Sequence, residues 1–145
     1  MSNATALPVV AKTLQTTNLW LDDVAEFIGP DRQTAWHALG AVLRTLRDRL
    51  PLNLSVHLGA ELPILIRGLY YDQWRPSEQP TKWRSADEFL EQVTERLDRV
   101  KPVNVTQAAR GVFHAIDHYV EPHQVEHVRN ALPEPVRILW TAGNA

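Results

Sequence analysis

The sequence contains an internal repeat, which constrains the fold more than any other feature. In each half, apolar residues recur at the spacing of one helix face, and a shift of 70 positions, from Ala35 to Val105, superposes the two rows without a gap. The first row is Ala35, Leu39, Val42, Leu43, Leu46 and Leu50, and the second is Val105, Ala109, Val112, Phe113, Ile116 and Val120. Each row predicts a helix that packs one face into a core.

The turns that follow the two rows also repeat. Pro63 and Pro133 occupy equivalent positions, and Arg67 and Arg137 follow them at the same distance. Proline suits the first turn of a helix and disfavours helix in the residue before it, so each predicts a change of chain direction. Neither half has much core of its own. The sequence therefore predicts an all-α fold, a single helical domain of two pseudo-symmetric four-helix repeats.

Capping signals predict how the chain is divided. Asn18 is a candidate cap for the first helix, Gly29 follows its end, and Ser85 and Asn104 are candidate caps for two helices of the second half. Residues before Thr17 are small, polar and aperiodic. The predicted division is a mobile N-terminal tail at 1–16, repeat one at 17–73, a connector at 74–84, repeat two at 85–140 and a C-terminal tail at 141–145.

Two long runs of the sequence resemble a known family. They are Ala38–Leu50 (ALGAVLRTLRDRL) and Leu58–Pro76 (LGAELPILIRGLYYDQWRP), and the likeness continues through Glu88–Leu90 to Arg137–Trp140. In these runs the chain resembles the bacterial domain-of-unknown-function 2267 family. The resemblance implies a small all-helical bacterial protein with an internal duplication. It implies no activity, cofactor or catalytic residue.

Composition excludes several classes of function. The 145 residues include 15 Lys and Arg against 17 Asp and Glu, so no net positive field favours nucleic acid or an acidic membrane. There is no cysteine, which removes disulfides, thiolate metal sites and thiol nucleophiles. No apolar stretch is long enough for a membrane span, and we do not expect the residues before the first helix to act as a secretory signal. We therefore expect a cytoplasmic protein with neither a nucleic-acid nor a membrane partner.

Histidines crowd into one segment of the second half and are the candidates for metal binding. The four residues are His114, His118, His123 and His127, and three carboxylates lie among them. Imidazoles one helical turn apart can share a zinc, nickel or iron ion with a carboxylate. A helical wheel, however, places His114 and His118 opposite the apolar row. A solvated polar face is therefore the expected role, and a metal or small-ligand site is the alternative.

Residues shared by the two halves predict structural roles. His57 and His127 are equivalent, and we expect each imidazole to bond a carbonyl at a proline corner. Arg67 and Arg137 are expected to donate to the last carbonyls of a neighbouring helix or to pair with a carboxylate, with substrate binding as the alternative.

The connector is rich in aromatic residues and arginine, the residue types that dominate interaction hot spots. Trp74 follows an apolar helix and is expected to be buried. Trp83, between two cations and beyond two prolines, is expected to be exposed and to form an interaction surface with Arg84 and Arg75. The alternative is that both tryptophans fix the connector to the helical bundle. No phosphate loop, nucleophile elbow or His-Glu-x-x-His motif is present. The sequence thus favours a non-enzymatic interaction or scaffold module without a cofactor, which binds a protein partner or itself.

Overall fold

The computed structural model describes residues 7–97 and 102–142, and its regular elements over these ranges are all helices. The predicted all-α class is therefore confirmed. The elements are α1 (Pro8–Ile28), α2 (Arg32–Arg49), α3 (Leu52–Glu61), α4 (Ile64–Tyr71), the short 3-10 helix η2 (Pro76–Glu78), α5 (Ala86–Arg96), α6 (Val105–Tyr119), α7 (Pro122–Ala131) and α8 (Glu134–Ala142). In the described part of the chain, no helix is both long enough and apolar enough to cross a membrane.

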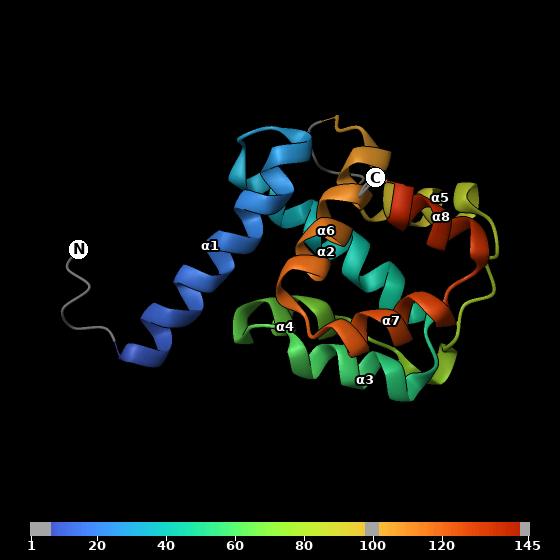
Figure 1. Cartoon of the computed structure of the whole chain (residues 1–145), viewed down its shortest axis with the longest axis horizontal. Helices are drawn as coiled ribbons and strands as arrows, with labels where there is room; N and C mark the ends of the chain where they lie inside the picture. Colours follow the sequence, from blue (N-terminus) through green and yellow to red (C-terminus); the bar gives the residue numbers. More distant parts are fainter. Residues whose placement is uncertain (1–6, 98–101, 143–145) are drawn as a thin grey trace.

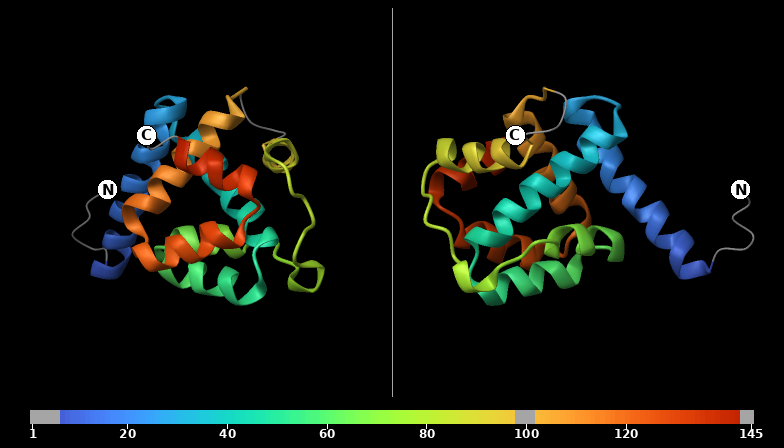
Figure 2. Two further views of the ribbon diagram at one scale, coloured as in Figure 1. Left: turned by 45° about the vertical axis from the view of Figure 1, so that its right-hand side comes forward. Right: turned by 180° about the vertical axis from the view of Figure 1, so that it is seen from behind.

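Helices α2 and α6 form the centre of the molecule (Figure 1). Helix α1 packs along both of them, α3 and α7 lie side by side at one end, and α5 and α8 lie at the other (Figure 2). The two apolar rows meet in this arrangement. Leu39 and Leu43 of α2 and Val112 and Ile116 of α6 are fully buried, as the helical spacing predicts. The core is therefore built jointly by both halves of the sequence.

Side-chain caps define several helix starts. Asp31 accepts from two backbone N–H groups at the start of α2, and Asn104 accepts from the backbone N–H of Gln107 at the start of α6. Ser85 caps α5: its hydroxyl accepts from the Glu88 backbone N–H at 3.0 Å and donates to the Glu88 carboxylate at 3.1 Å. The predicted caps of α5 and α6 are thus confirmed.

The repeat is visible in the helix boundaries. Helix α7 runs from 122 to 131 and α3 from 52 to 61, so both ends of these helices differ by 70 positions. Helices α4 and α8 likewise begin 70 positions apart, at 64 and 134. The two halves therefore share a pattern of helices and turns. A pseudo-symmetric relation between them in space stays a prediction.

The first helix begins earlier than the sequence predicts. It starts at Pro8 rather than after Asn18, so residues 8–16, assigned to a tail, are helical. Proline suits this first turn, and the Thr16 and Thr17 hydroxyls bond carbonyls four residues back, as they do within helices. The first half of α1 extends outward from one side of the other helices (Figure 1). Residues 141–142, assigned to the C-terminal tail, are likewise helical, because α8 continues to Ala142. Positions 1–6 and 143–145 of the predicted tails lie outside the described residues.

The connector contradicts the expectation for its tryptophans. Trp83 is 6% exposed and packs against Phe89, with ring centroids 5.3 Å apart, so it belongs to the core. Trp74 is only partly buried, and its indole N–H donates to Gln79. The reason is that the connector runs back along α2, where Arg49 Nε donates to the Trp83 carbonyl at 2.9 Å. Proline in the connector therefore does not turn Trp83 out into solvent.

Candidate metal centre

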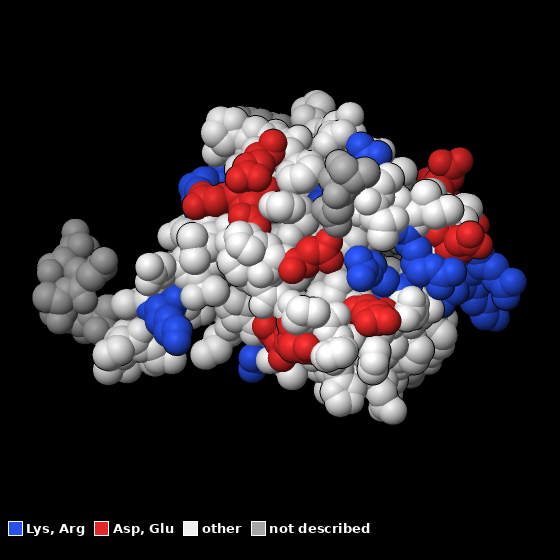
Figure 3. Space-filling view, in the orientation of Figure 1, with Lys and Arg blue, Asp and Glu red and all other residues white. Residues whose placement is uncertain are grey.

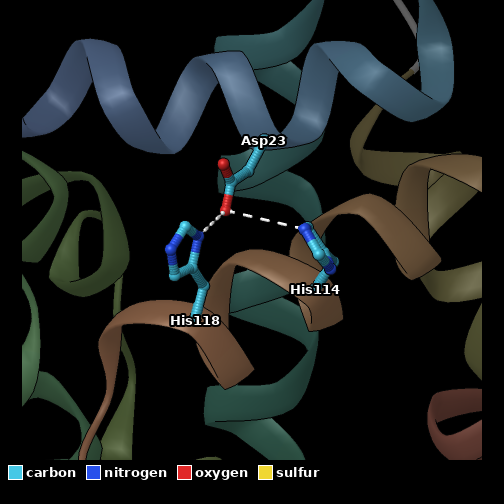
Figure 4. Close-up of side chains that lie close together, drawn as sticks. All are labelled: Asp23, His114 and His118. Carbon is cyan, nitrogen blue, oxygen red and sulfur yellow. Dashed lines mark hydrogen bonds and ion pairs between the residues drawn. The ribbon is translucent and has the colours of Figure 1, made fainter. Parts of the chain in front are cut away.

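The polar face of α6 is covered in part by α1. His114 and His118 lie one turn apart on α6, and Asp23 of α1 points toward both (Figure 4). Asp23 Oδ2 lies 2.7 Å from Nδ1 of His118 and 3.9 Å from Nε2 of His114. The expected solvated face is therefore found only in part, because α1 packs against the side of α6 that the helical wheel leaves outside the core.

The three side chains have the geometry of a shared site. One potential ligand atom from each of Asp23, His114 and His118 lies within 4.8 Å of the others. A second carboxylate is near, since Glu26 Oε2 is 3.9 Å from His114 Nε2. Zinc binds imidazole nitrogen and carboxylate oxygen at about 2.0–2.2 Å, so small side-chain movements would bring the three ligand atoms around one ion.

Neighbouring side chains hold these groups in place. The Asp23 side chain is 9% exposed, and the Tyr119 hydroxyl donates to its Oδ1 at 3.4 Å. Burial, followed by the charge of Asp23, raises the pKa of Tyr119 above its ordinary value, so the hydroxyl stays a donor. The His118 ring stacks on Tyr119 at 4.0 Å, and the His114 ring lies against Phe27 at 5.5 Å. Such contacts restrict the rings to a few orientations.

The site is open on one side. The His118 side chain is 54% exposed and that of His114 is 37% exposed, so solvent reaches both imidazoles. Two imidazoles and one carboxylate form a nitrogen–oxygen set that suits zinc, nickel or iron, and they leave a fourth position for water or another ligand. The cluster also works as an ion pair between α1 and α6 whenever His118 is protonated.

A family model described as an uncharacterized conserved protein (DUF2267) matches residues 17–139. The chain belongs to the DUF2267 family. No curated protein matches the sequence. The DUF2267 region includes Asp23, His114 and His118, so all three candidate ligands lie within the family match.

The four-histidine site expected as the alternative is not formed. His123 and His127 lie exposed on α7, and among the described residues neither joins a cluster of three or more metal-ligating side chains. Glu121 instead caps α7 by accepting from the backbone N–H groups of His123 and Gln124, and the first of these bonds lowers the pKa of Glu121. The carboxylate nearest His114 and His118 in sequence, Asp117, accepts from the Trp140 indole.

Sequence reasoning missed Asp23, the one buried ligand of the cluster. It lies 91 positions before His114 (114 − 23), so no local motif connects them. A signal does exist within α1. Asp23 interrupts the apolar face formed by Trp20, Val24 and Phe27, and a carboxylate at such a position requires a partner from another element.

The structural roles expected of the histidine pair and the arginine pair have different outcomes. His57 and His127 are both exposed, and within the described ranges neither imidazole has a hydrogen-bond partner. The expected carbonyl bonds are therefore absent there, because both rings point outward from α3 and α7. Arg67 donates to Ala60 and Leu62 at the end of α3, and Arg137 donates to Asn130 near the end of α7. These bonds are of the kind expected of this pair.

A second polar cluster was also missed, and it fixes the connector to α2. It surrounds a cavity of about 470 Å³ between α2, α5 and the connector. Arg47, 3% exposed, donates to the carbonyls of Tyr70 and Asp72 and to Asp48. Arg96 of α5 donates to Asp48 as well, and burial lowers its pKa. The charged side chains that line this cavity are largely paired with one another. We therefore interpret the cluster as structural and call it the clamp below.

Proposed function

We propose that this protein binds one divalent transition-metal ion at Asp23, His114 and His118. The observation that carries the proposal is the convergence of one carboxylate and two imidazoles, from two helices, on a volume that a single ion can occupy. The candidate ions are zinc, nickel and iron, for which this set of nitrogen and oxygen ligands is suitable.

The surroundings of Asp23 support this proposal over a simple surface cluster. A carboxylate buried to this degree needs a nearby positive charge or several hydrogen-bond donors. A bound metal ion would supply that charge even at a pH at which histidine side chains are neutral. The Tyr119 bond to Asp23 resembles the outer-shell bonds that orient metal ligands in proteins. Glu26 offers a further oxygen next to His114. Bound metal would join α1 to α6 and stabilise the folded state.

The test is metal binding by untagged protein after chelator treatment. Titration calorimetry with Zn²⁺, Ni²⁺ and Co²⁺ should give one site per chain, and saturation with the preferred ion should raise the melting temperature. The variants His118→Ala and Asp23→Asn should each weaken binding about tenfold or more, because each removes one ligand. His123→Ala is the matched control and should bind as the natural chain does. Binding that survives in Asp23→Asn, or that is lost in His123→Ala, would refute the assignment.

An interaction or scaffold module is the second candidate, and its support is reduced by the fold. Arg75 and Arg84 remain exposed in the connector, as expected of an interaction surface. Trp83, the aromatic residue on which that surface chiefly depended, is buried. A cytoplasmic location fits both candidates, since a chain without cysteine needs no oxidising compartment. The measurement that separates the two candidate functions is whether the protein holds one metal ion per chain after it has been loaded with metal.

A further inference from the structure

A groove of about 410 Å³ lies between the first half of α1 and the α3–α4 corner. Its walls are largely apolar, with Val9 on α1 and Leu62, Pro63 and Ile64 on the opposite side. Its volume falls within the range of small-molecule sites. The α1 wall is formed mainly by residues before Thr17, so much of it lies outside the 17–139 family match.

Two residues that line the groove carry N–H groups without an acceptor. Trp20 is fully buried, and its Nε1 has no hydrogen-bond partner within the described part of the chain. The same holds for Nε of Arg67, whose Nη2 is occupied by carbonyls at the end of α3. Buried hydrogen-bond donors are nearly always paired in native proteins. Two unpaired N–H groups among the residues that line one groove therefore indicate that a ligand with an acceptor group binds there.

The net charge of the side chains that line the groove is positive. Lys12 and Arg67 both line it, and neither has an ion pair in the described ranges. Glu61 is the only acidic residue among those that line the groove in this part of the structure, and its carboxylate accepts from the backbone of Glu121 at 3.2 Å. A ligand that complements these walls is therefore apolar along its length and negative at one end.

We propose that the groove binds a small amphipathic carboxylic acid. The apolar chain of the acid lies against Val9, Leu62 and Ile64, and its carboxylate accepts from Lys12 and Arg67. The indole N–H of Trp20 gains an acceptor in the occupied state. This site is separate from the metal cluster, although Tyr119 contacts both: it lines the groove and donates to Asp23. The proposal does not depend on metal binding.

The test uses decanoate below its micelle-forming concentration as the probe, with decanol as the neutral match. Chelator-treated full-length protein is titrated while the indole N–H resonances are followed by NMR, and the Trp20 signal is identified by its loss in Trp20→Phe. Decanoate should bind saturably at one site and shift the Trp20 signal. Decanol should bind about tenfold more weakly, because it carries no negative charge to pair with the two cations.

Variants at the edge of the groove complete the test. Lys12→Met removes a cation, and Ile64→Glu places a negative charge in the groove at a side chain that is 59% exposed. Both should weaken decanoate binding about fivefold or more without lowering the melting temperature, whereas Lys82→Met, an exposed connector position, should change nothing. The proposal fails if decanoate and decanol bind equally, if the Trp20 signal does not move, or if Lys12→Met binds as the natural chain does.

Discussion

At the scale of single residues, the two connector tryptophans show how far local sequence can be trusted. Trp83 is flanked by Lys82 and Arg84, and such neighbours usually indicate an exposed position. In the structure its ring packs on Phe89, and the Arg49 guanidinium lies 5.5 Å from its centroid. The flanking cations reach solvent while the indole does not, because alternate residues of an extended segment point to opposite sides.

Replacement of Trp83 by alanine should therefore destabilise the fold strongly. Deletion of a buried indole leaves a cavity and removes its contacts with Phe89, so the free energy of unfolding should fall by about 3–5 kcal/mol. Trp74→Ala is the matched comparison, with an expected cost of about 1–2 kcal/mol for its lost stacking and its bond to Gln79. Urea denaturation of both variants measures the difference. A smaller loss for Trp83→Ala than for Trp74→Ala would show that the connector does not pack on the core as described.

The candidate ligands differ in how visible they are in the sequence. His114 and His118 stand out because they lie one turn apart, and the metal alternative followed from that spacing. Asp23 could not be paired with them, since the contact depends on α1 crossing α6. The same contact decides which histidines belong to the site. His123 and His127 share the spacing of the first pair, but in the part of the chain that the structure describes they join no cluster of three or more metal-ligating side chains.

At the scale of elements, the connector is attached to α2 by polar contacts. Gln79 Nε2 donates to Ser55 and to the carbonyls of Arg47 and Leu50, and the Thr81 N–H donates to the Asp48 carbonyl. These carbonyls lie in the last turn of α2 and at its C-cap, Leu50, where no further helical N–H is available to them. Connector residues thus complete the hydrogen bonding of this helix end. Periodicity cannot reveal such contacts, because they join segments about 30 residues apart without a repeating pattern.

Arg47 is the centre of this clamp, and its loss should weaken the fold. Arg47→Leu leaves the carbonyls of Tyr70 and Asp72 without their donor, and the first of these bonds is buried. We expect a loss of about 3 kcal/mol or more in the free energy of unfolding, because one partner of a buried charged network is removed. Arg75→Ala, at a side chain that is 78% exposed, is the control and should cost less than about 0.5 kcal/mol. Equal stability of the two variants would mean that the clamp contributes little.

The boundaries of α1 mark the limit of prediction from periodicity. The apolar face from Trp20 onward predicted a helix, because these side chains enter the core. The first half of α1 has exposed apolar residues, among them Val9, Val10 and Leu14, and it faces the α3–α4 corner across the groove. No periodic core face marks that half. Its helical state follows from continuation of a helix already formed, which costs less than starting a new one.

At the scale of the whole molecule, the two halves depend on each other. Helix α2 of the first half packs against α5 and α6 of the second, α1 packs along α6, and α3 packs against α7 (Figure 2). An ion pair also joins the two halves, since Asp48 of α2 pairs with Arg96 of α5. The surface over the projecting half of α1 carries few charges in comparison with the connector side (Figure 3). A large part of the helix packing therefore lies between the repeats.

This arrangement predicts that the halves fold only together. Fragments 1–75 and 76–145 separate α1–α4 from α5–α8, and each alone exposes its apolar row to water, so neither should show a cooperative thermal transition. When the two fragments are co-expressed, they should co-purify in a one-to-one ratio and show a single cooperative thermal transition, because every helix of the core is then present. Val112→Asp, at a fully buried position of α6, should abolish this association, whereas Ile138→Asp, at a side chain that is 58% exposed, should preserve it. A cooperative transition in either fragment alone would show instead that one repeat is an independent folding unit, to which the other was added.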